Sequence, residues 1–129
     1  MKATGTFSVA RKPAAEDKVG PLSFSRWLLD KTFSGSLAAT STVEMLAVGS
    51  ELTGAAAYVA MERVVGNLGG KKGSFVLIQN GFMDKHSQRL TVTVVSGCST
   101  DELFGLEGSM TIDIKDSNHF YDFQYEING

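Results

Sequence analysis

The alternation of apolar and polar positions is the dominant pattern along the chain. Four segments place an apolar side chain at every second position, namely 4–10, 90–95, 109–115 and 120–127. Because successive side chains of a strand point to opposite faces, this pattern predicts strands with one buried face and one face in water. Its repetition along one short chain is typical of an antiparallel sheet.

Four less regular apolar runs complete the set, at 22–33, 36–48, 54–66 and 73–84. In the third of these runs, AAAYVAME has fair helix propensity and a helix could compete. β-Branched residues, among them Val59 and Val64, and glycine at both ends favour a strand instead. We therefore expect this run to be a strand.

The segments between these runs have the composition of turns. NLGGKKG (67–73) predicts a hairpin, DKHSQ (84–88) a polar reversal and DSN (116–118) a tight turn. The segment RKPAAEDKVGP (11–21) is rich in charged residues and contains two prolines, which predicts a longer, mobile connecting loop.

The runs together predict an all-β domain of eight antiparallel strands spanning 1–129. An open sheet of this kind would leave two edges exposed, whereas a closed barrel has none. A barrel of about eight strands is just wide enough to be filled by side chains or to hold one small ligand. We expect a closed barrel, with a two-sheet sandwich as the alternative.

Composition and net charge limit the classes of protein to which the chain can belong. Hydrophobic residues make up 43% of the chain, charged residues 20%, and the net charge is −2. No basic stripe indicates a nucleic-acid partner, and no segment has the length of a membrane-spanning helix. With no apolar leader and a single cysteine, Cys98, we expect a cytoplasmic protein. The two histidines have no metal-ligand spacing, so we expect no metal and no cofactor.

Glu62 and Arg63 are the most informative charged residues. They are consecutive on a predicted strand, so they point to opposite faces, and both faces are otherwise mostly apolar. One of the two charges should therefore point into the interior, where it must be paired or lie next to water. A buried carboxylate suits general acid or base chemistry, and an internal salt bridge is the structural alternative.

Several aromatic and long side chains could line a cavity in such a barrel. They are Tyr58, Trp27, Tyr125, Phe123 and Met83. Plain core packing is the alternative for this set.

Three blocks of the chain resemble a known family. KTFSGSLAATSTVEML (31–46), AAYVAMERVVGNLGGKKGSFVL (56–77) and TVTVVSGCSTDELFGLEGSMTI (91–112) are similar to the family catalogued as domain of unknown function 3224. The resemblance implies an eight-stranded calycin-like barrel, similar to the allene oxide cyclase barrels. Gln79 stands where relatives often have histidine, so a proton transfer by that histidine would not carry over to this chain. The ligand-binding candidates are Glu62, Arg63, Tyr58, Gln79, Trp27 and Tyr125.

Three functions follow as hypotheses. The first is a binding barrel that holds a small apolar ligand, with Glu62 or Arg63 fixing its polar end. The second is an isomerase or cyclase of the allene oxide cyclase type, which would hold a flexible substrate in one conformation. The third is a structural homo-oligomer formed through the outer face of the sheet.

Overall fold

The computed structural model describes residues 1–128, which form a closed barrel of eight antiparallel strands in chain order. The strands are β1 (Lys2–Val19), β2 (Leu22–Gly35), β3 (Leu37–Ser50), β4 (Ala56–Leu68), β5 (Lys71–Met83), β6 (Gln88–Val94), β7 (Leu106–Lys115) and β8 (Asn118–Ile127). The closed barrel is confirmed, and the run predicted as a strand at 54–66 corresponds to β4.

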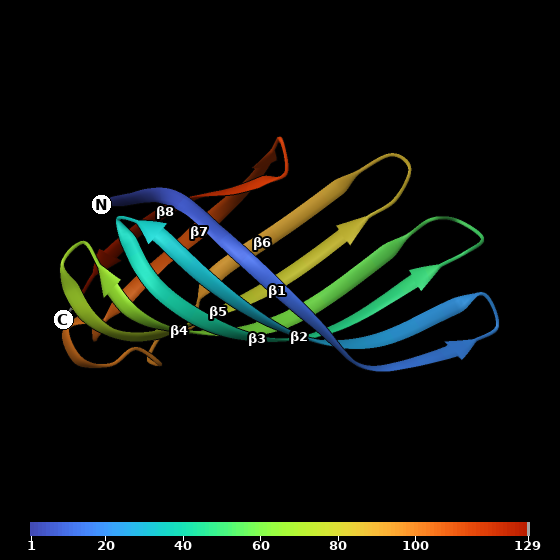
Figure 1. Cartoon of the computed structure of the whole chain (residues 1–129), viewed down its shortest axis with the longest axis horizontal. Coiled ribbons are helices and arrows are strands. Elements are labelled where there is room, and N and C mark those ends of the chain that lie inside the picture. The colour runs from blue at the N-terminus through green and yellow to red at the C-terminus, as the bar shows by residue number, and fades with distance from the viewer. Residues whose placement is uncertain (129) are drawn as a thin grey trace.

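The pairing between neighbouring strands is more complete at one end of the barrel than at the other. β1 pairs with β8 only over Lys2–Phe7, and the rest of β1 pairs with β2 alone. β6 and β7 share a single register pair, Thr93 with Ser109. The hairpins β1–β2, β3–β4 and β5–β6 therefore run past the closed part, and their turns fan out on the right of Figure 1. We call this side the open end.

The prediction of a loop at 11–21 is wrong. β1 continues to Val19, and the chain reverses only at Gly20–Pro21. The side chains of 11–19 are all exposed, so their polar composition reflects a ribbon in water and not the absence of backbone pairing.

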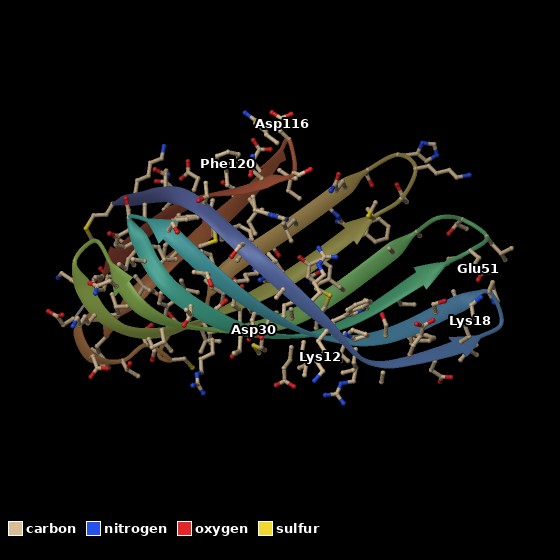
Figure 2. The ribbon with its side chains drawn as sticks, viewed as in Figure 1. Lys12, Lys18, Asp30, Glu51, Asp116 and Phe120 are labelled. Carbon is tan, nitrogen blue, oxygen red and sulfur yellow. The ribbon has the colours of Figure 1, made fainter. Side chains whose placement is uncertain are left out.

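The β1–β2 ribbon is attached at its tip to the neighbouring β3–β4 turn. The backbone N–H of Glu51 donates to the carbonyl of Pro21 at 3.0 Å, and Lys18 forms an ion pair with Glu51. Figure 2 shows these two charged side chains near each other at the tips of the two hairpins. These two contacts connect the β1–β2 hairpin to the β3–β4 hairpin at the open end.

The interior contains two apolar clusters. The larger cluster fills the closed end and includes Phe33, Leu37, Val64, Phe75, Leu77 and Phe123. The smaller cluster lies nearer the open end and consists of Leu29, Val43 and Ala60, with Trp27, Met45 and Tyr58 packed against it. The single helical element of residues 1–128 is the short turn η1 (Asp101–Leu103), so no helix there could cross a membrane.

Candidate functional site

A layer of polar side chains separates the two apolar clusters. We call Lys31, Ser41, Glu62 and Gln79 the polar layer; they come from β2, β3, β4 and β5 and all point inward. Strand alternation explains the position, because each lies two residues from a buried apolar side chain on the same face, as Lys31 lies between Leu29 and Phe33.

Glu62 is the centre of the polar layer. Its side chain is 1% exposed, and its oxygens accept three hydrogen bonds. Lys31 Nζ lies 3.1 Å and Gln79 Nε2 2.5 Å from Oε1, while Ser41 Oγ lies 2.6 Å from Oε2. The internal salt bridge considered as an alternative is therefore present. Of the two consecutive charges, Glu62 faces the interior and Arg63 faces out.

Lys31 balances the buried charge. Its side chain is 7% exposed, and its ammonium lies 4.9 Å from the ring centroid of Phe7 and 5.9 Å from that of Phe33. These aromatic faces give the cation further electrostatic partners in a site without bulk water. The ion pair and its hydrogen bonds recover part of the free energy that the desolvation of the two charges costs.

Tyr58 extends the polar layer toward the open end. Its hydroxyl donates to Gln79 Oε1 at 3.1 Å, so a chain of hydrogen bonds runs from Tyr58 through Gln79 to Glu62. Burial raises the pKa of the Tyr58 phenol above its ordinary value of 10.0, and the negative charge of Glu62 raises it further. Tyr58 is therefore a neutral phenol at physiological pH.

A cavity of about 200 Å³ lies next to Tyr58, between the ends of β3, β4, β5 and β6 at the open end. We call it the mouth cavity. Its wall includes Met45, Ala47, Tyr58, Gly81, Met83 and Leu90, with Gln88 and Arg89 as further polar members. Tyr58 belongs to this wall, whereas Glu62 and Gln79 lie behind it.

The remaining residues proposed from the sequence lie elsewhere. Arg63 lines a depression of about 600 Å³ on the outer surface, together with Lys72 and Asp101. Trp27 packs against the smaller apolar cluster, and its Nε1 donates to Ser25 Oγ at 3.0 Å. Tyr125 packs against the larger cluster at the closed end. The structure thus brings Tyr58, Gln79 and Glu62 together and leaves these three residues out of the chain of hydrogen bonds.

Lys31 and Ser41 were missed as members of the site. Their signal was present in the alternation, since Lys31 shares a face with Leu29 and Phe33, and Ser41 shares one with buried Val43. A polar residue at an apolar position of a strand indicates a buried partner. Among residues 1–128, no three histidine, cysteine or acidic side chains gather where a metal ion could bind.

The outer face of the sheet carries exposed apolar side chains. A groove of about 480 Å³ on this face is lined by exposed apolar residues of β3, β4 and β5, namely Leu46, Val59, Met61 and Ile78. Arg26 and Glu44 form one edge of this groove, with Arg26 Nη2 3.7 Å from Glu44 Oε1.

Comparison with known proteins gives the family. The family described as "Protein of unknown function (DUF3224)" matches residues 3–125. No curated protein matches the chain. The crystal structure of a protein with unknown function from the DUF3224 family of Shewanella oneidensis MR-1 is similar, with 43% sequence identity, a TM-score of 0.93, and coverage of 100% of this chain and 98% of that chain. The chain therefore belongs to the DUF3224 family.

Proposed function

We propose that this protein binds a small, largely apolar molecule in the mouth cavity. The observation that carries the proposal is an apolar recess of about 200 Å³ whose wall includes Tyr58, a residue with a part-buried hydroxyl that donates to Gln79. Small-molecule sites are typically apolar recesses with a few fixed polar groups. An engineered apolar cavity of about 150 Å³ binds benzene, so a single-ring molecule matches the size of this one.

The polar layer limits how deep a ligand can enter. Behind Tyr58 lie Gln79, 5% exposed, and Glu62, 1% exposed, and beyond them the closed end is filled by the larger apolar cluster. Entering further would require breaking the Lys31–Glu62 pair in a site without bulk water. The ligand therefore occupies the open end, with its inner tip against Tyr58.

The proposal is tested by filling the cavity. Ala47 faces inward and lies in the cavity wall, so Ala47→Phe should occupy the space and weaken binding of a single-ring probe such as ethylbenzene at least tenfold. Leu46→Phe is the matched control, because Leu46 is the neighbouring residue and faces outward. Binding is measured by titration of ¹⁵N-labelled protein followed by NMR. Equal binding by the two variants, or no binding by the unaltered protein, would refute the proposal.

The isomerase or cyclase alternative stays a prediction. Glu62 was its candidate acid or base, and both of its oxygens already accept hydrogen bonds from Lys31, Ser41 and Gln79. A general base must reach the proton it removes, directly or through one water. Because Glu62 is 1% exposed and lies behind Tyr58, this geometry gives no support to that role.

A further inference from the structure

We infer that the mouth cavity selects apolar molecules with a hydrogen-bond donor, an O–H or N–H, at their inner tip, and disfavours isosteres that carry only an acceptor there. The inference rests on the proposed function, because it names the ligand class for the same site. The structural basis is the direction of the hydrogen bonds that connect Glu62, Gln79 and Tyr58.

The direction begins at Glu62. An ionised carboxylate, paired with the Lys31 ammonium, can only accept hydrogen bonds. The group of Gln79 that faces Glu62 must therefore be its amide N–H₂, at 2.5 Å. The amide oxygen of Gln79 then points the other way, toward Tyr58.

The same logic fixes the Tyr58 hydroxyl. The amide oxygen of Gln79 can only accept, so the hydroxyl proton of Tyr58 is committed to it over 3.1 Å. A hydroxyl has one proton, and its remaining capacity is that of an acceptor. The polar group that Tyr58 offers to the mouth cavity is thus an oxygen lone pair.

This oxygen is also a better acceptor than that of a free phenol. A hydroxyl that donates one hydrogen bond is polarised, and chains of hydrogen bonds strengthen one another in a site of low dielectric. Because burial keeps the phenol protonated, the direction of the chain is the same across the physiological pH range. An O–H or N–H of a ligand can therefore donate a hydrogen bond to the Tyr58 oxygen. A ligand carbonyl can only accept, and it finds another acceptor at this position.

Three probes with one carbon skeleton test the inference, namely 1-phenylethanol, acetophenone and ethylbenzene. A net hydrogen bond is worth a factor of about three to ten in affinity. The unaltered protein should bind the alcohol about threefold to tenfold more tightly than the ketone. Tyr58→Phe removes the acceptor and should abolish this preference of the alcohol over the ketone.

Gln79→Met is the decisive second variant. It removes the acceptor that holds the Tyr58 proton and leaves Glu62 with Lys31 and Ser41. The freed hydroxyl can then donate to a ketone, so acetophenone should gain affinity relative to the alcohol. A purely structural role of Gln79 would weaken all three probes by the same factor.

The outcomes separate the two proposals. If ethylbenzene binds in the mouth cavity and the ketone binds as tightly as the alcohol, the donor selection is refuted and the binding function stands. If none of the probes binds, both are refuted. An unchanged order of affinities in Gln79→Met also refutes the donor selection.

Discussion

Lys31 Nζ lies 3.1 Å from Glu62 Oε1 inside the barrel, between the two apolar clusters, and both side chains are more than nine-tenths buried. Removing one partner of such a pair leaves an uncompensated buried charge, which is strongly destabilising. The pair links β2 to β4 through the interior of the barrel, and we expect the protein to need both members together.

Single substitutions at this pair should lower the free energy of unfolding substantially. Lys31→Met and Glu62→Leu should each cost about 3–5 kcal/mol, because each leaves the other charge buried and unpaired. The double variant should recover most of the loss, since it buries two apolar side chains instead. Urea denaturation of the four proteins gives the coupling energy as a double-mutant cycle.

The exposed pair between Lys2 and Asp122 is the matched control. Its atoms are 3.2 Å apart, close to the spacing of the buried pair, but its side chains are 57% and 39% exposed. Asp122→Ala should change the free energy of unfolding by no more than about 1 kcal/mol. Additive losses in the buried double variant would show that the two buried charges do not interact.

Tyr58 should make stability depend on alkaline pH. Its pKa is raised in the folded state by burial and by Glu62, so the folded protein holds this proton more tightly than the unfolded chain does. The resulting stability is fully present below the unfolded tyrosine pKa of about 10 and is lost as the pH rises through the higher folded value. Urea denaturation between neutral pH and pH ~11 measures the loss.

Tyr58→Phe isolates the contribution of this one phenol. The variant keeps the ring and the other tyrosines, including Tyr121, whose pKa is also raised by burial. Its stability should therefore fall less steeply above pH ~10 than that of the unaltered protein. Parallel curves for the two proteins would mean that Tyr58 is not perturbed by its surroundings.

Gly81 should be required for the position of the Tyr58 ring. The two residues pair across β4 and β5, and a methyl group on Gly81 would overlap the ring of Tyr58. Gly81→Ala should lower the free energy of unfolding by about 1–3 kcal/mol and weaken binding of 1-phenylethanol. Thermal denaturation and NMR titration measure the two effects.

Gly49 provides the control for that substitution. It also lies in a strand, β3, but a methyl group there would meet no atom within 4 Å. Gly49→Ala should change stability by no more than about 0.5 kcal/mol and leave binding intact. If both alanine variants behave alike, the packing of Tyr58 on Gly81 has no energetic importance.

Assembly into a homo-oligomer stays a prediction. The groove lined by Leu46, Val59, Met61 and Ile78 is the apolar part of the outer face on which it would rest. Light scattering of the purified protein measures the mass directly, and Val59→Glu should lower it if this face is the interface. A monomer at high concentration would contradict the prediction.

The fold could be predicted from the sequence because its strands alternate so regularly. The alternation along β4 shows that Glu62 and Arg63 point to opposite faces of the sheet. Because both faces of β4 are rich in apolar residues, the alternation does not show which of the two residues points into the barrel. The polar ribbon at 11–19 was missed because a strand exposed on both faces has no alternation. The extent of β1 depends on pairing with β2, which composition does not encode.

The site was predictable only in part, because its members come from four strands. Lys31 and Glu62 are far apart in the chain, and their contact follows from the register of β2, β3 and β4. Trp27 and Tyr125 were reasonable cavity candidates by residue type, yet both pack against apolar clusters. An aromatic residue at a core position gives no sign of whether a cavity lies beside it.

The most direct test of the binding site is a crystal structure of the protein with 1-phenylethanol. We expect the ring to lie between Met45 and Leu90 in the mouth cavity, with the ligand hydroxyl donating to Tyr58 Oη at a distance of about 2.7–2.8 Å. An empty mouth cavity at saturating ligand, or a hydroxyl turned away from Tyr58 toward solvent, would contradict this.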